Sequence, residues 1–375
     1  MKKFFRAYSD LKKFNKIDKN ERKIVFYAEN ENSYLFFEGL IRILIEKYNQ
    51  KIFYVTSSIT DPILKNNNKN INSFFVGDKA IRTIFFQLFN SSIMILTMPE
   101  LNVSYIKKSK KKVNYIYITH NILSIHMVFR KKAFNYYDTF FCVGPHHNAE
   151  ITETEKIYKL NKINQFNFGY NKIDKLLLNK KTKNSDSNQN KTLIIAPSWG
   201  KDSILETFGI ALLSSLVNKN WKIIIRPHPD TLKFNLKKYK EVYDKFKNHP
   251  DCEFEENISN TDSFYISDIM ISDWSGSAFE FAFGLEKPVI FINLPKKINN
   301  SEFHLYQSVP IEINLRKEIG EVIEITEIDK IHEKIEKMYL KKLELKKKIA
   351  NIRDKVIYNV GSSAEKGAEY IKNLI

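Results

Sequence analysis

The chain repeats short apolar segments that do not alternate with polar residues, and most are followed by a helical pattern. Examples are KIVFYAE (23–29), KIFYVTSS (51–58) and SIMILTM (92–98). A strand with one face in water alternates apolar and polar side chains, whereas a strand of a parallel sheet covered by helices on both faces is apolar throughout. The sequence therefore predicts an α/β fold with parallel sheets.

This βα rhythm occurs in two series. The first series continues with strands at 73–77, 113–120, 138–144 and 163–170 and helices over 33–48, 79–89 and 146–160. The second has strands at 192–198, 221–227, 268–273 and 287–293 and helices near 203–218, 235–248, 277–283 and 327–356. Because 375 residues exceed the usual size of one domain, we predict two Rossmann-like domains.

The boundary between the series is compositional. NKKTKNSDSNQNK (179–191) contains no apolar residue, which is typical of a linker. We therefore predict an N-terminal Rossmann-like domain over 1–178, a linker over 179–191, and a C-terminal Rossmann-like domain with the C-terminal helices over 192–375.

Composition excludes several classes of protein. Cys142 and Cys252 are far apart, which argues against a disulfide framework or a zinc site and suits a reducing compartment. The N-terminus lacks a signal-peptide pattern, and no apolar stretch approaches the ~20 residues of a membrane span. The expected location is the cytoplasm.

The formal charge of +17 suits acidic partners, although an AT-rich coding sequence explains the excess of lysine equally well. Without a nucleic-acid-binding motif, we expect no nucleic-acid partner.

RPHPD (226–230) follows the apolar run III and holds two functional side chains in a stiff backbone. Pro227 and Pro229 each fix φ near −65°. A guanidinium beside an imidazole with restricted motion suits a phosphate. The structural alternative is that Arg226 forms a salt bridge and His228 caps a helix.

SDWSGSAFEFAFG (272–284) places small and hydroxyl residues between a strand and an apolar helix. Ser275, Gly276 and Ser277 at a helix N-terminus, after Asp273, predict an anion cradle. A capping box formed by Ser277 and Glu280, with Gly284 as the helix stop, is the structural alternative, and both can hold.

Two other strand ends carry candidate residues. APSWGK (196–201) supplies Ser198 and Lys201, which form a weak signal alone. His120 closes the strand at 113–120 and is a candidate general base, because an unperturbed imidazole takes up a proton near neutral pH. His126 is harder to place. His146 and His147 are neighbours on a helix and are not expected to chelate a metal together.

These motifs together resemble the CDP-glycerol glycerophosphotransferase family, the teichoic-acid primases and polymerases. The resemblance covers about residues 113–373 and rests on a strand-end histidine, FGYNKIDKLL, IIAPSWG, RPHPD, SDWSGSAFEFAFGLEKPVIF and NVGSSAEKGAEYI, in that order. It implies a GT-B-like fold, in which two Rossmann-like domains face each other across a cleft. The resemblance also implies that 1–178 is the acceptor domain and that 192–375 is the nucleotide-donor domain. The sequence departs from the family pattern at Asn121, Gly200, Asn171 and Lys172, where the family usually has glycine, arginine, and proline-arginine. Lys201 or Lys172 is expected to supply the missing charge.

The resemblance also implies the roles of the motif residues. His120 and His228 are the expected catalytic residues, His120 as base and His228 at the donor phosphates. The expected donor-binding residues are Arg226, Ser198, Lys201, Asp273, Ser275, Gly276, Ser277 and Glu280. No cofactor and no metal are expected, so turnover should be metal-independent.

The implied reaction moves glycerol phosphate, or a related polyol phosphate, from a CDP-linked donor to a hydroxyl of a saccharide or lipid-linked acceptor and releases CMP. A GT-B glycosyltransferase that uses a CMP-sugar or another nucleotide sugar for capsule or lipopolysaccharide synthesis is the alternative. A non-catalytic surface-binding protein is a third class.

The first residues suggest a membrane partner. In MKKFFRAYSDLKKFNK, one face of a helix would carry Phe4, Tyr8, Leu11 and either Phe14 or Asn15, while its other faces are basic. Such a helix can lie on an anionic membrane, at the inner face of the bacterial plasma membrane, or pack on its own protein. The basic run KKSKKK (107–112) could contribute to the same surface.

Overall fold

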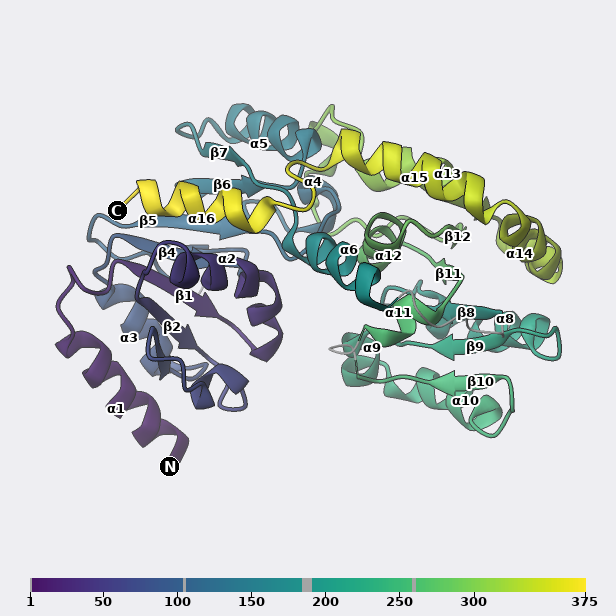
Figure 1. The fold of residues 1–375 in the computed structure, drawn as a ribbon, viewed down its shortest axis with the longest axis horizontal. Coiled ribbons are helices and arrows are strands. Elements are labelled where there is room, and N and C mark those ends of the chain that lie inside the picture. Colours follow the sequence, from purple (N-terminus) through teal and green to yellow (C-terminus); the bar gives the residue numbers. More distant parts are fainter. Residues whose placement is uncertain (1, 104–105, 184–190, 258–260) are drawn as a thin grey trace. The chain divides into compact units, whose positions relative to one another are not determined.

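The computed structural model describes residues 2–103, 106–183, 191–257 and 261–375. The chain forms two compact units, each built on its own parallel sheet (Figure 1). The first unit contains Met1–Lys172, Ile298–Ser308 and Ile357–Ile375. The second contains Ile173–Lys297 and Val309–Val356. The predicted α/β class with two parallel sheets is confirmed.

The first sheet has seven strands in the order β3-β2-β1-β4-β5-β6-β7. They are β1 (Ile24–Ala28), β2 (Ile52–Thr56), β3 (Ile71–Phe75), β4 (Ile93–Leu96), β5 (Asn114–Ile118), β6 (Thr139–Cys142) and β7 (Asn164–Asn167). All neighbours are parallel, and Ile24 lies opposite both Ile52 and Ile93. The strand order reverses between β1 and β4, where ligands bind most often in open parallel sheets.

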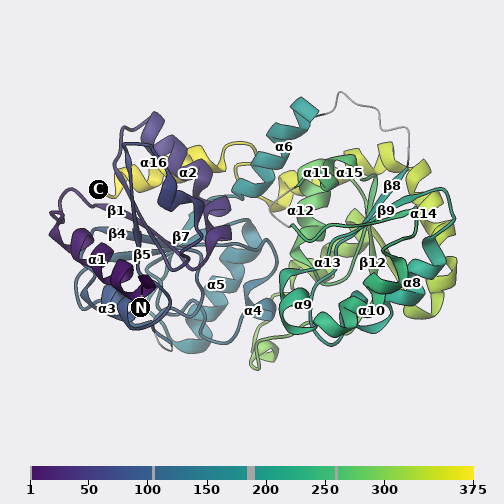
Figure 2. The same cartoon turned by 90° about the horizontal axis from the view of Figure 1, so that it is seen from below.

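Helices cover both faces of this sheet (Figures 1 and 2). α1 (Lys2–Lys16) and α3 (Ala80–Leu88) share a buried core with Val25 and Tyr27, while α2 (Tyr34–Glu46) and α16 (Ser363–Asn373) share one with Ile24 and Phe26. Successive β1 side chains therefore enter different cores, which explains why the strand is apolar throughout.

The second sheet has six parallel strands in the order β10-β9-β8-β11-β12-β13. They are β8 (Thr192–Ile195), β9 (Lys222–Ile225), β10 (Cys252–Phe254), β11 (Ile269–Ser272), β12 (Val289–Ile292) and β13 (Gly320–Ile323). One core lies between this sheet and α7 (Ile204–Thr207), α8 (Gly209–Leu216), α10 (Leu236–Phe246) and α14 (Ile331–Leu340). α12 (Gly276–Leu285) is almost entirely buried.

The edge strands β10 and β13 were not predicted. Each is short, and CEF and GEVI contain charged residues and little apolar periodicity. Gly320 opens β13 because a side chain there would meet the main chain of Val289, with Cβ only 1.7 Å from its carbonyl oxygen. That contact is long-range, so local sequence gives no sign of it.

Two predicted helices are divided. The helix expected at 203–218 is α7 and α8, separated at Phe208, whose backbone leaves the helical region. The helix expected at 327–356 is a 3-10 turn (Ile325–Lys330), then α14 and α15 (Lys342–Val356). Among the helices within the described ranges, none is long and apolar enough to cross a membrane.

The units also differ from the predicted division of the chain. α6 (Asn171–Lys183) extends through the first part of the expected linker, 179–183, while 184–190 lie outside the described residues. Residues 298–308 and 357–375 belong to the first unit, since α16 buries Ala368 and Ile371 against α2. The composition of the sequence does not mark the points at which the chain returns to the first unit.

Candidate functional site

Three of the predicted motifs meet at one edge of the second sheet. β9, β8 and β11 are neighbours and run parallel, so their carboxyl ends lie side by side. RPHPD follows β9, APSWGK follows β8, and SDWSGS covers the end of β11 and the start of α12. The strand order reverses between β8 and β11, which is the usual place for a ligand in such a sheet.

His228 is held as a neutral hydrogen-bond donor. It caps α9 (Pro229–Phe234), and its Nδ1 accepts from the backbone N–H of Asp230 at 3.1 Å. Burial lowers the pKa of His228 to about 4; Asp230 opposes this shift and Lys297 adds to it. Since Nδ1 accepts, the proton of the neutral ring is on Nε2. The side chain stays 36% exposed, so Nε2–H suits a phosphate oxygen.

Arg226 is paired with other side chains of the protein. One guanidinium nitrogen lies 2.6 Å from Glu255 Oε2 and 3.2 Å from Ser263 Oγ, and the residue is 7% exposed. The guanidinium also lies over the Phe264 ring. The salt bridge that was the structural alternative is therefore present. A buried, paired guanidinium suits positioning of the β9 end better than direct phosphate binding.

Asp273 organises the loop after β8. Its two carboxylate oxygens accept the backbone N–H groups of Ser198 at 2.6 Å and Ile204 at 3.2 Å. The residue is 1% exposed, and burial raises the pKa of this carboxyl above its ordinary value despite those bonds. Asp273 and Ser198 are thus brought together, with the carboxylate committed to the protein backbone.

The amino end of α12 has the geometry of an anion site, with one correction to its capping. Ser275, not Ser277, is the N-cap, and Ser275 Oγ accepts from the Ser277 N–H. The two hydroxyls lie 2.7 Å apart. Backbone amides and the helix dipole favour negative charge at this place. Glu280 lies one turn further along and is 5% exposed.

Gly284 does not end α12 as predicted. The helix continues to Leu285, and Glu286 adopts the left-handed conformation after it. Gly284 is needed for packing instead, because a Cβ there would lie 2.6 Å from Leu176.

Trp199 and Lys297 complete this edge and were missed from sequence. The Trp199 indole stacks on His228 with ring centroids 6.2 Å apart. Lys297 Nζ donates to the Trp199 carbonyl oxygen at 2.7 Å and lies 4.4 Å from the ring centroid. Lys201, which was predicted to supply positive charge at this site, is exposed. It follows Gly200, whose φ of +105° disfavours any residue other than glycine. Lys297 had no nearby motif to mark it.

His120 lies at the corresponding edge of the first sheet. Its Nδ1 is 3.0 Å from the Thr97 carbonyl oxygen at the end of β4, and a carbonyl only accepts. The neutral ring therefore carries its proton on Nδ1 and its basic lone pair on Nε2. The rings of Phe36 and Phe129 make T-shaped contacts with the imidazole. This tautomer suits a proton acceptor at Nε2.

Glu29 is a second titratable group at this edge and was missed. It follows β1, and burial raises the pKa of its carboxyl to about 7, with Arg82 opposing the shift. The sequence signal was present, since Glu29 ends an apolar strand as His120 does.

Two departures from the family pattern have structural explanations. Asn121 Oδ1 accepts from the Leu123 N–H, which shapes the turn after His120. Asn171 is 8% exposed, donates to the Phe36 carbonyl and accepts from Ser363 Oγ, so it joins α2, α6 and α16.

His146 and His147 bind backbone groups. Their Nε2 atoms lie 3.0 Å from the carbonyl oxygens of Ile122 and Leu123, respectively. Across the part of the chain that the structure describes, no three His, Cys, Asp or Glu side chains gather as a metal site would need.

Solved structures share this architecture. The wall teichoic acid polymerase TagF is 14% identical with a TM-score of 0.61, over 98% of this chain and 94% of that chain. UDP-GlcNAc 2-epimerase from Neisseria meningitidis is 11% identical with a TM-score of 0.58, over 94% and 100%. A glycosyltransferase from Rickettsia africae ESF-5 is 14% identical with a TM-score of 0.56, over 94% and 98%. At these identities the likeness shows the fold.

Two parallel α/β units with such neighbours define a GT-B-like protein, as predicted. The family model of CDP-glycerol:poly(glycerophosphate) glycerophosphotransferase matches residues 11–371. The chain belongs to this family of transferases, and the predicted resemblance is confirmed. A comparison with curated proteins found no match.

Proposed function

We propose that the protein transfers glycerol phosphate from CDP-glycerol to a hydroxyl of a saccharide or lipid-linked acceptor, in teichoic acid synthesis, and releases CMP. Family membership across residues 11–371 carries this proposal. The TagF neighbours support teichoic acid as the class of polymer, and one TagF variant was studied after soaking with CDPG. The edge of the second sheet supplies the anion-binding groups that such a donor requires.

The donor diphosphate is assigned to the edge formed by β9, β8 and α12. His228 Nε2–H, the amino end of α12 at Ser275–Ser277, and the Lys297 ammonium are the groups that would hold it. The Lys297 pKa is lowered by burial, while Asp273, Asp230 and Glu206 favour the charged form. Arg226, Asp273 and Ser198 position these groups through the bonds described above. Lys201 and Glu280 remain proposed donor-site residues.

The proposed chemistry is a direct displacement. The acceptor hydroxyl oxygen forms a bond to the phosphorus that bears glycerol, and its proton passes to Nε2 of His120. The bond from that phosphorus to the oxygen shared with CMP breaks, and CMP leaves with the bonding electrons. Fixed donors aimed at the phosphates stabilise the charge that develops on the transferring group and on CMP.

Donor preference tests this proposal. CDP-glycerol, CMP, CMP-sialic acid and UDP-sugars are titrated calorimetrically into the protein. We expect CDP-glycerol to bind more tightly than any CMP-sugar or UDP-sugar. Tighter binding of a CMP-sugar would favour the glycosyltransferase alternative, and absence of nucleotide binding would contradict both.

We also propose metal-independent turnover, because the chain's own cations and amides can neutralise the donor phosphates. Transfer measured with excess EDTA is expected to retain at least about half of its rate, since no step relies on a metal as Lewis acid. Complete loss in EDTA, restored by Mg²⁺ or Mn²⁺, would contradict this.

The first helix supports a proposed association with anionic membrane. Leu11 and Phe14 of α1 are in the core, so the helix packs on its own protein, as the structural alternative held. However, Phe4, Phe5 and Tyr8 are 55%, 63% and 44% exposed. Basic residues, Lys2, Lys3, Arg6, Lys12 and Lys13, accompany them on the same helix. Exposed aromatic rings beside cations suit an interface rich in anionic lipid.

A triple substitution tests this surface. Replacing Phe4, Phe5 and Tyr8 by serine is expected to weaken binding to phosphatidylglycerol vesicles by about 10-fold or more, since apolar area is lost from the lipid contact. Leu88→Ser on α3, where Leu88 is 60% exposed, is the matched control. Deleting 2–16 would not be a clean test because it removes the buried Phe14. Unchanged vesicle co-sedimentation of the triple variant would refute the proposal.

A further inference from the structure

The segment after His120 is a buried loop. Residues 121–128 contain only one turn of helix, α4 (Ile125–Val128), and Ile122 through Met127 are all buried. Buried backbone N–H and C=O groups need hydrogen-bond partners. An irregular segment lacks the regular backbone hydrogen bonds of a helix or a sheet that would supply them. The partners of this loop, which we call the His120 loop, therefore come from other elements.

One side of the His120 loop is bound by α5 (Pro145–Tyr158). His146 and His147 bond the Ile122 and Leu123 carbonyls at 3.0 Å each, and Glu150 Oε2 accepts the Ile125 N–H at 2.6 Å. His147 is itself fixed, because its Nδ1 accepts the Val143 N–H at 3.2 Å. His147 and Glu150 are both 0% exposed.

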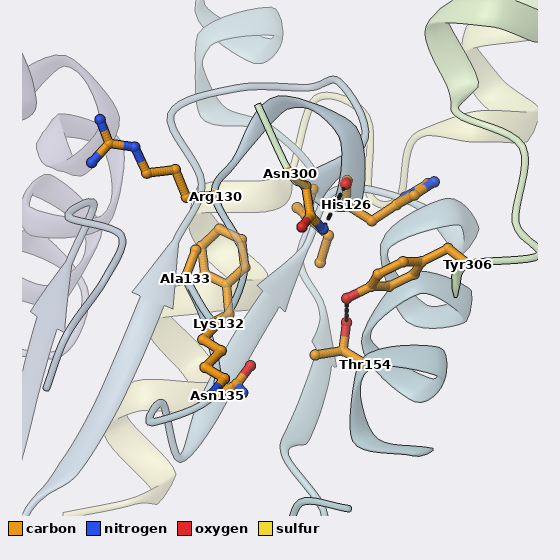
Figure 3. Close-up of a pocket in the computed structure, with 10 residues that line it drawn as sticks. His126, Arg130, Lys132, Ala133, Asn135, Thr154, Asn300 and Tyr306 are labelled. Atoms are coloured by element: carbon orange, nitrogen blue, oxygen red, sulfur yellow. Dashed lines mark hydrogen bonds between the residues drawn. The ribbon is translucent and has the colours of Figure 1, made fainter. Parts of the chain in front are cut away.

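The other side is bound by residues 298–308, which return to this unit from a distant part of the chain. Asn300 Nδ2 donates to the His126 carbonyl at 3.0 Å, and Asn300 is 3% exposed. The His126 ring stacks on Phe303 and Tyr306, at centroid distances of 5.3 and 4.8 Å. Tyr306 also bonds Thr154 of α5 at 3.0 Å, as Figure 3 shows. The loop is thus held from two sides.

The charge states of the α5 histidines agree with this role. Burial lowers the pKa of His146 and of His147; His126 adds to both shifts, and Glu150 opposes that of His147. Both rings are therefore neutral, with Nε2–H directed at a carbonyl oxygen. Their Nε2 atoms therefore serve the backbone of the His120 loop.

We propose that His147 and Glu150 are positioning residues, which fix the His120 loop and thereby orient the imidazole of His120. The inference rests on the proposed function, in which His120 accepts the proton of the acceptor hydroxyl. The loop begins at the residue after His120, so release of its backbone shifts the ring away from Thr97. A displacement of ~1 Å of a reacting group lowers rate by about 100-fold.

Comparing Glu150→Ala with Glu150→Gln separates the hydrogen bond that positions the His120 loop from the negative charge of Glu150. The glutamine keeps an oxygen that can accept the Ile125 N–H, whereas alanine leaves that N–H without its partner. We expect Glu150→Ala to lower kcat about 10- to 100-fold and Glu150→Gln to stay within about 3-fold of wild type. Calorimetric affinity for CDP-glycerol should be unchanged in both, since the donor residues belong to the other unit.

Glu155→Ala is the matched control. Glu155 also lies on α5 and accepts a backbone N–H at 2.6 Å, but from Ile163 and not from the His120 loop. Its removal should lower thermal stability through the lost hydrogen bond while leaving kcat within about 2-fold. Equal loss of kcat in the two variants would overturn the proposal.

The His120 tautomer is a readout that does not depend on activity. Nitrogen-15 NMR of the imidazoles, with His120→Asn used for assignment, should show protonated Nδ1 in wild type and Glu150→Gln and a mixture of tautomers in Glu150→Ala. An unchanged tautomer in Glu150→Ala would overturn the proposal. A changed tautomer with normal kcat would support the positioning by Glu150 and contradict the proposed role of His120 as the base. If Glu150→Ala does not fold, Asn300→Ala releases the same loop and carries the same expectations.

Discussion

Replacing His228 by alanine is expected to lower kcat/KM for CDP-glycerol by about 100- to 1,000-fold, the usual effect of removing a fixed donor from a developing charge. His228 Nε2–H is the only side-chain N–H of RPHPD that we assign directly to the donor phosphates. The variant should also bind CDP-glycerol more weakly by calorimetry. Because the His228 pKa is about 4, the wild-type ring stays neutral, and its contribution should not change between about pH 6 and 8.

The chain contains a matched control for this substitution. His249 is also followed by Pro and Asp, and its Nδ1 accepts the Asp251 N–H at 3.2 Å, as His228 does from Asp230 at 3.1 Å. His249 precedes β10 and so lies at the opposite end of the strands. His249→Ala should lose the same local bond and leave kcat/KM within about 2-fold. Similar losses in both variants would show that the effect of His228→Ala is structural.

His120→Asn is expected to lower kcat by about 100- to 10,000-fold, the range for loss of a general base. Affinity for CDP-glycerol should be unchanged, since His120 belongs to the first unit and the donor residues to the second. Stopped reactions that quantify CMP release give kcat, and calorimetry gives the affinity. His304→Ala replaces an exposed histidine of the same unit and should have no effect.

A small loss in His120→Asn, below about 10-fold, would move the base elsewhere. Glu29 would then be the first residue to substitute, because its carboxyl has a pKa of about 7 at the same sheet edge. Loss of donor binding together with kcat would instead indicate that the variant is not correctly folded.

Much of the edge of the second sheet to which we assign the donor was predictable, because it depends on local sequence patterns. Apolar strands that end in Arg226, Ser198 and Asp273 must place those residues at one edge once the strands are parallel neighbours. The roles within the edge depend on long-range partners. Glu255 neutralises Arg226 from beyond the three-residue strand β10, which has no clear periodicity. Lys297 reaches Trp199 from a loop almost a hundred residues later in the chain.

The first unit shows the same limit of local sequence patterns. His120 was identifiable as a strand-end histidine. Its tautomer was not, since it depends on Thr97, which follows a different strand, β4. His126 and His147 could not be interpreted locally, because their partners are Tyr306 and the Leu123 carbonyl. Buried histidines that bond loop backbone have no sequence signature that separates them from catalytic ones.

The central claim is tested most directly by following the transferred group. CDP-glycerol labelled with tritium in glycerol and with phosphorus-32 in the glycerol-bearing phosphate is incubated with the protein and a synthetic lipid bearing a terminal glycerol phosphate. We predict that both labels enter the product in equal amounts, in a phosphodiester labile to hydrofluoric acid, with one CMP released per transfer. Transfer of a sugar from a CMP-sugar or UDP-sugar, with neither label transferred from CDP-glycerol, would contradict the claim.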